Sequence, residues 1–207
     1  MDALTIISII EVVILPLNAL LVLIAVVAVY RRIKHQEFGN DLNYLFIFFV
    51  IALILDTVQY FFPKGQNNLF INHIATPVEF FFFTMTFRNW ETKLKKWYTL
   101  TIPFLTALII IDCYLLVPQD QFPLRSMIIG AFLVLVFSGR TIFVISEDQK
   151  YRIIIVFSIM FYSVMSMFLS VFLPTDILAA QVKVYVTEVS YLAFIAGVIS
   201  ARNRSSK

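Results

Sequence analysis

Residues 42–62 read LNYLFIFFVIALILDTVQYFF, an almost unbroken apolar run that carries one charge, Asp56. A transmembrane helix needs about 20 consecutive, mostly apolar residues, and this run has that length. Similar runs recur along the chain, in which 60% of the 207 residues are hydrophobic and 14% are charged. The mean hydropathy is +0.89. This composition predicts an all-α, polytopic membrane protein rather than a soluble domain.

Short polar segments that contain Pro, Gly, Asn or charge clusters separate the apolar runs, as solvated turns do. We therefore predict one domain over residues 1–207, a bundle of seven transmembrane helices. The predicted spans are 4–30, 42–62, 69–88, 97–117, 124–145, 152–173 and 183–201. Residues 1–30 are long for a signal peptide and lack a basic start, so we expect them to form the first span.

The distribution of Lys and Arg predicts the orientation of the chain. Twelve of these residues fall in the first, third and fifth loops and the C-terminal tail: Arg31, Arg32, Lys34, Arg88, Lys93, Lys95, Lys96, Lys150, Arg152, Arg202, Arg204 and Lys207. The opposite side carries three: Lys64, Arg125 and Lys183. Because basic loops stay in the cytoplasm, the N-terminus is predicted outside and the C-terminus inside.

Several classes of protein are disfavoured by what the chain lacks. The net charge of +3 comes from short loops rather than a basic stripe, so nucleic acid is not an expected partner. The single cysteine, Cys113, excludes an intrachain disulfide and any cysteine-based metal site. Two histidines are too few for a three-histidine zinc site. No HExxH, Walker, GxGxxG or GxSxG motif occurs, so we predict neither a metal nor a cofactor.

Carboxylates inside the predicted spans are the main functional clue. There are five: Glu11, Asp56, Glu79, Asp112 and Glu188. One strong base, Arg140, lies well inside a span. A charge near the bilayer centre costs about 2.5–3.5 kcal/mol on insertion scales. The surplus acids must therefore be protonated, share a wet cavity or meet an outside cation.

Polar residues near these acids follow helical stripes. One stripe holds Asp56, Gln59 and Tyr60, and a second holds Asn72, Thr76 and Glu79, with His73 beside it. Further groups are Glu188 with Tyr185 and Tyr191, Tyr162 with Ser163, Ser166 and Ser170, and Glu11 with Asn18. Such stripes turn towards the bundle because lipid offers no hydrogen bonds. We predict an outward-open polar pocket or an internal network among the first, second, third, sixth and seventh spans.

Structural roles compete with binding roles for several of these residues. Ser and Thr commonly bond helix carbonyls or join helices, and His73 is more typical of a hydrogen-bond partner between helices than of a metal ligand. Asp56 and Asp112 lie near the predicted outer surface, where hydration would explain them. Arg140 is predicted to pair with an acid or to extend towards the cytoplasm. Glu79 and Glu188 lie deeper and are the stronger site candidates.

Residues 67–80, NNLFINHIATPVEF, carry a recognisable pattern: Asn-Asn-Leu, three residues, His-Ile, and then Thr, two residues, Glu-Phe. This pattern resembles the second-to-third helix region of small seven-helix integral membrane proteins of Bacteroidota, a family with no established activity. Asp56 late in the second span fits the resemblance, whereas Arg140 stands where a hydroxyl or apolar residue is expected. The resemblance implies a bacterial inner membrane and draws attention to His73 and Glu79.

Three functions are compatible with these features. The first is a binding or sensing protein for a small cationic ligand, an amine or a proton, which would signal through a partner protein at the cytoplasmic loops. The second is a proton-coupled small-molecule transporter. The third is an intramembrane enzyme acting on lipid, although no nucleophile or metal cage supports it; a structural subunit is also compatible. The candidate ligand- or proton-binding residues are Glu79, His73, Glu188, Asp56, Glu11, Gln59, Asn72 and Tyr191.

Overall fold

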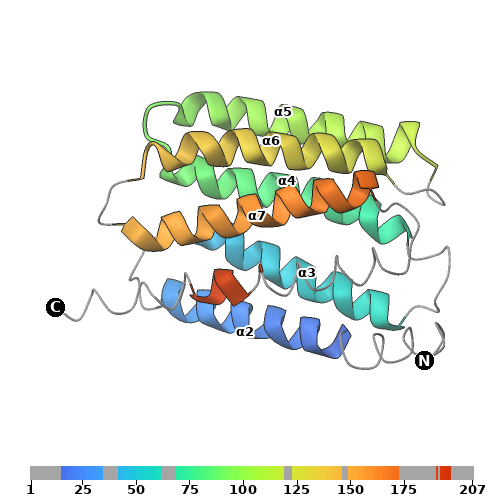
Figure 1. Ribbon diagram of the computed structural model, residues 1–207, viewed down its shortest axis with the longest axis horizontal. Coiled ribbons are helices and arrows are strands. Elements are labelled where there is room, and N and C mark those ends of the chain that lie inside the picture. Colours follow the sequence, from blue (N-terminus) through green and yellow to red (C-terminus); the bar gives the residue numbers. More distant parts are fainter. Residues whose placement is uncertain are drawn as a thin grey trace.

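The computed structural model describes residues 15–34, 42–61, 69–118, 123–145, 149–172, 190 and 192–196, and this part of the chain is helical and contains no strand (Figure 1). The helices are α2 (Leu15–Lys34), α3 (Asn43–Phe61), α4 (Leu69–Trp90), α5 (Lys95–Ile111), α6 (Leu124–Ile142) and α7 (Lys150–Phe172). A π-helical segment, η3 (Asp112–Leu116), continues α5. Residues 192–196 are also helical. The predicted all-α class is confirmed.

The helix limits follow the apolar runs of the sequence. Five predicted spans, from 42–62 to 152–173, coincide with α3 to α7 to within a few residues. Helix α2 continues past the predicted end at residue 30 to Lys34, because the basic residues that follow are good helix formers. Most of the predicted span 183–201, and the first residues of the predicted span 4–30, lie outside the described residues.

Three segments in the described part of the chain are long and apolar enough to cross a membrane: Lys95–Leu116, Leu124–Ile142 and Lys150–Phe168. Two shorter apolar segments, Ala19–Arg31 and Asn43–Leu55, lie in α2 and α3. Helix α4 is not among them, since it carries polar residues such as Asn72, His73 and Glu79. Length and composition therefore support three of the seven predicted spans.

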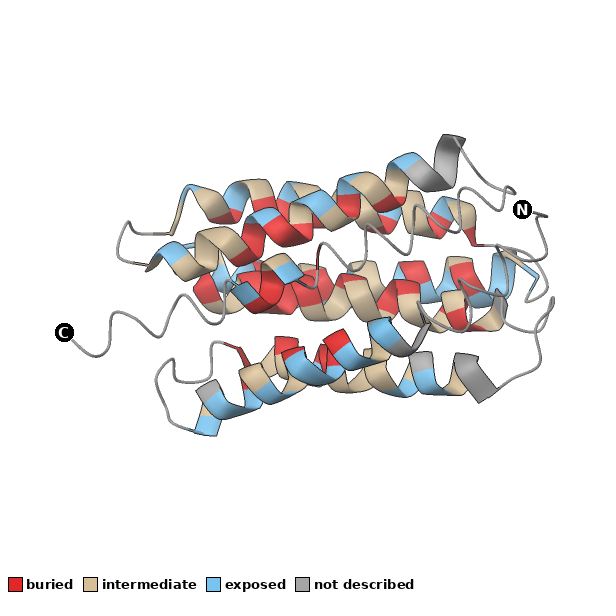
Figure 2. Ribbon diagram, turned by 60° about the horizontal axis from the view of Figure 1, so that its bottom comes forward, coloured by how far each residue is buried: buried red, intermediate tan, exposed pale blue. Residues whose placement is uncertain are grey.

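Helix α4 lies at the centre of the described bundle and packs against α3, α5 and α6, while α6 also packs against α7 and α2 against α3. Its buried side chains include Phe80, Phe83 and Phe87. In Figure 2 the buried residues lie where helices face one another, and many exposed residues lie on the outer sides. A helix that is covered on several sides is expected to be apolar on several sides, as α4 is.

Candidate functional site

A small pocket lies between the middle parts of α4, α6 and α7; it is partly open to its surroundings and has room for about one or two water molecules. Its polar lining comes from α4 and α7, and its apolar lining comes mainly from α6. The lining residues are Thr76, Glu79, Phe80, Phe83, Met127, Gly130, Ala131, Val134, Tyr162, Ser163 and Ser166. The pocket brings together residues of two predicted polar stripes, one on α4 and one on α7. The contribution of α6, the fifth predicted span, was not predicted.

Glu79 and Tyr162 meet across this pocket. The Tyr162 hydroxyl donates a hydrogen bond of 2.7 Å to Oε1 of Glu79, although the two residues are 83 positions apart in the chain. Phe83, one turn after Glu79 on α4, is buried and meets the Tyr162 ring edge to face, with ring centroids 6.2 Å apart. This ring contact holds the phenol beside the carboxylate. A half-buried carboxylate with an oriented hydroxyl can bind a cation or exchange a proton.

Small residues of α6 form part of the pocket lining. A Cβ added at Gly130 would lie 3.8 Å from Thr76 and from Ile109, which is an ordinary contact distance. Ala131 follows it on the same wall. Ser163 and Ser166, both buried, add hydroxyls to the α7 side. The result is a pocket with one carboxylate, several hydroxyls and an apolar wall.

Hydroxyl groups elsewhere in the bundle serve the helix backbone. Thr84 donates to the carbonyl of Phe80 at 2.6 Å, and Thr86 donates to that of Phe82 at 2.9 Å. Thr76, although it lines the pocket, donates to the carbonyl of Asn72 at 2.8 Å. These bonds within one helix satisfy hydroxyls that would otherwise be buried without a partner. Between Glu79 and the predicted cytoplasmic end of α4, the hydroxyls of Thr84 and Thr86 are therefore bonded to the backbone of their own helix.

His73 lies against a different neighbour from Glu79. It is fully buried, and its Nδ1 lies 2.5 Å from the carbonyl oxygen of Cys113 in η3. A carbonyl can only accept, so Nδ1 carries the hydrogen in this bond. A π-helical turn disturbs the normal carbonyl pairing, and His73 provides a donor there. His73 thus ties α4 to η3, and the pocket lining does not include it.

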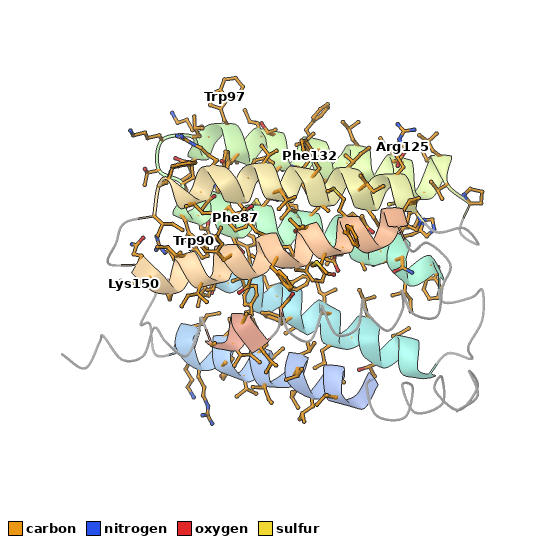
Figure 3. All side chains as sticks on the ribbon, in the orientation of Figure 1. Phe87, Trp90, Trp97, Arg125, Phe132 and Lys150 are labelled. Carbon is orange, nitrogen blue, oxygen red and sulfur yellow. The ribbon has the colours of Figure 1, made fainter. Side chains whose placement is uncertain are left out.

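Asp112, the first residue of η3, has two partners at the start of α6. The Ser126 hydroxyl donates to its Oδ2 at 2.5 Å, and Nε of Arg125 lies 3.6 Å from its Oδ1. The Arg125 side chain is largely exposed, whereas that of Asp112 is mostly buried. Figure 3 places Arg125 at the end of the bundle opposite to Trp90 and Lys150. Asp112 therefore joins the end of α5 to the start of α6.

Arg140 forms its ion pair with Glu91, an acid that the sequence interpretation left in a basic turn. Arg140 Nε lies 3.6 Å from Oε2 of Glu91, whose side chain is fully buried. The other oxygen of Glu91, Oε1, accepts the backbone N–H groups of Lys93 at 2.9 Å and Leu94 at 3.2 Å. Glu91 thus joins the turn before α5 to the end of α6. The signal available in the sequence was a lone acid four residues before the start of α5, where a negative charge suits the positive end of the helix dipole.

The remaining predicted site residues differ in how far the structure describes them. Asn72 is half-buried on α4, and its carbonyl accepts the Thr76 hydroxyl described above. Asp56 and Gln59 fall on α3, but their side chains lie outside the described part. Glu11, Glu188 and Tyr191 lie outside the described residues altogether. Within the described residues, no group of three or more His, Cys, Asp or Glu could hold a metal ion.

Comparisons with protein-family models, curated proteins and solved structures found no match for this chain.

Proposed function

We propose that this chain is a seven-span protein of a bacterial inner membrane that binds a small cation, an amine or a proton at Glu79 and signals through a partner protein. The supporting observation is the hydrogen bond between Glu79 and Tyr162 in the pocket of α4, α6 and α7. A carboxylate attracts cations and repels anions, and a low-dielectric surrounding strengthens both effects. The hydroxyl oxygens of Thr76, Ser163 and Ser166 line the pocket and would accept hydrogen bonds from the N–H groups of an amine ligand.

Exposed apolar side chains support placement in a membrane. Leu115, Phe132 and Phe157 are among many large apolar residues that α5, η3, α6 and α7 expose. Soluble monomers rarely expose contiguous apolar patches of more than a few hundred Å². Lipid accepts such faces, and the three apolar segments long enough to cross a bilayer belong to this part of the bundle. The remaining spans and the orientation are proposed from the apolar runs and the basic loops.

We favour binding over transport because the polar groups of α4 on the proposed cytoplasmic side of Glu79 are bonded within the bundle. A transporter needs a second polar path from the site to the other side of the membrane. The α4 hydroxyls in that direction, Thr84 and Thr86, donate to carbonyls of their own helix. The buried carboxylate of Glu91 and the partly exposed guanidinium of Arg140 join the end of α4 to α6 beyond them. These contacts support a pocket that opens on one side.

Binding can be tested by the thermal unfolding of the purified protein in detergent, from about pH 4.5 to 8.5, with a panel of metal cations and amines. A ligand that binds only the folded state stabilises it by about 2.7 kcal/mol at 100 times its Kd. We therefore expect at least one cation, amine or acidic pH to raise the unfolding temperature. If none does, the binding function is wrong and a structural subunit becomes the better interpretation.

Cysteine labelling can test the proposed orientation. Cys113, the single native cysteine, is fully buried and is not expected to react with a membrane-impermeant maleimide. We expect Lys64→Cys to be labelled in intact cells and Lys96→Cys only after the membrane is opened. The opposite result would reverse the orientation. Labelling of both positions in intact cells would argue against any membrane barrier between the two loops.

A further inference from the structure

We propose that the turn between α4 and α5, together with the adjoining outer face of α5, binds the headgroup and one acyl chain of an anionic phospholipid. This inference rests on the proposed placement in a membrane, with the turn in the cytoplasmic leaflet. It concerns the end of α4 at Trp90 (Figure 3). The Glu79 pocket lies in the middle of that helix.

Exposed positive charge gathers at this turn, and none of the residues 88–96 that form it is an exposed acid. Lys93, Lys95 and Lys96 are all exposed. Glu91 is the only acid in residues 88–96, and it is turned inward, where it bonds the backbone of the turn and pairs with Arg140. Its ion pair is with Arg140 of α6 rather than with the lysines of the turn. The three ammonium groups remain available to an outside anion.

Arg88 adds a positioned guanidinium to the same surface. Its Nε donates to Oγ1 of Thr99 at 2.9 Å, and its Nη1 lies 3.4 Å from Oδ1 of Asn89. Thr99 in turn donates to the carbonyl of Lys95 at 2.7 Å. This chain of bonds ties the guanidinium of α4 to the first turn of α5. Of the five N–H donors of an arginine, two are used in these described contacts, and the others can bind phosphate oxygens.

An exposed apolar stripe continues from the basic turn along α5. Trp97, Leu100 and Phe104 are 69%, 72% and 62% exposed, and they follow one another at helical spacings of three and four residues. Figure 3 shows Trp97 pointing away from the bundle. Tryptophan favours the boundary between headgroups and acyl chains. The order of basic turn, indole and apolar stripe matches the order of headgroup, interface and acyl chain in a lipid.

A lipid explains this arrangement better than a soluble phosphate does. Both would meet the lysines and Arg88, since the phosphate group is the same. A soluble phosphate gains nothing from Leu100 or Phe104, whereas an acyl chain covers them. We therefore assign the site to an anionic phospholipid and treat soluble phosphate as an outcome that the experiment can reveal.

The test uses quenching of tryptophan fluorescence by phospholipids brominated on the acyl chain, with the protein in lipid nanodiscs. We expect brominated phosphatidylglycerol to quench Trp97 at lower mole fractions than brominated phosphatidylcholine does. The Trp97→Phe variant assigns the signal, because Trp90 is buried. Each basic residue near an anionic surface contributes about a factor of five in affinity. Lys95→Gln with Lys96→Gln should therefore weaken the preference by about 10- to 30-fold.

Arg31→Gln with Lys34→Gln is the matched control. Both residues are exposed at the end of α2, and the change in net charge is the same. This control should keep the lipid preference. Equal quenching by the two lipids would overturn the proposal, because the site would then have no preference for an anionic headgroup. Equal losses in the two double variants would also overturn it, in favour of a general effect of surface charge. If millimolar inorganic phosphate abolished the preference for phosphatidylglycerol, the site would be one for a soluble phosphate rather than for a lipid. A protein that fails to enter nanodiscs would instead contradict the proposed membrane placement.

Discussion

Replacing Glu91 with alanine is expected to lower the thermal unfolding temperature in detergent by about 5–15 °C. The carboxylate is fully buried, accepts two backbone N–H groups in the turn before α5 and lies 3.6 Å from Arg140. Hydrogen bonds to a charged group contribute about 1.5–3 kcal/mol, and a partly exposed ion pair adds up to about 1 kcal/mol. Together these suggest a loss of about 2–4 kcal/mol, and each kcal/mol moves the midpoint of a chain of this size by about 2–4 °C.

Two other substitutions separate the charge of Glu91 from its hydrogen bonds. Glu91→Gln keeps an acceptor for Lys93 and Leu94 but loses the ion pair, so we expect a smaller loss. Asp112→Ala is the matched control, because Asp112 pairs with Arg125, whose side chain is 72% exposed. The pair with the exposed Arg125 contributes little, and the variant also loses one hydrogen bond from Ser126, so it should lose less than Glu91→Ala, which frees two backbone N–H groups. Equal unfolding temperatures for Glu91→Ala and the wild type would show that the contacts of Glu91 do not stabilise the bundle.

Helix positions could be predicted from the sequence because the required signal is local. A run such as 42–62 has to be helical to satisfy its backbone in an apolar surrounding, and the polar segments mark its ends. The stripes of Asn72, Thr76 and Glu79 and of Tyr162, Ser163 and Ser166 were found in the same way, since helical spacing puts them on one face. Both stripes contribute residues to the pocket, the first through Thr76 and Glu79.

Contacts between distant segments could not be predicted in this way. His73 meets a backbone carbonyl of η3, and a backbone acceptor leaves no trace in residue types. Arg140 meets Glu91 across 49 positions of the chain, in a turn whose four basic residues suggested only a cytoplasmic loop. The apolar wall from α6 was missed because Gly130 and Ala131 carry no polar signal. These features depend on how the helices pack against one another. Packing between distant segments cannot be predicted from the residue pattern within each segment.

Glu79→Gln is expected to abolish most of the stabilisation by whichever cation or amine the wild type binds. The amide keeps the shape of the side chain and an acceptor for Tyr162 but removes the charge that attracts the ligand. A hydrogen bond to a charged group contributes about 1.5–3 kcal/mol, which corresponds to a Kd about 10- to 100-fold higher. The measurement is the dependence of the unfolding temperature on ligand concentration in both proteins. The folded state should otherwise tolerate the change, since Glu79 is only half-buried.

Tyr162→Phe and Asp112→Asn show whether the effect belongs to the pocket. Tyr162→Phe retains the ring contact with Phe83 and removes only the hydroxyl that orients Glu79, so we expect the Kd to rise about fivefold, the equivalent of one ordinary hydrogen bond. Asp112→Asn makes the same change from acid to amide outside the pocket, beside Ser126, and should leave the Kd unchanged. Loss of binding in Asp112→Asn with normal binding in Glu79→Gln would move the cation site from the pocket to the junction of α5 and α6.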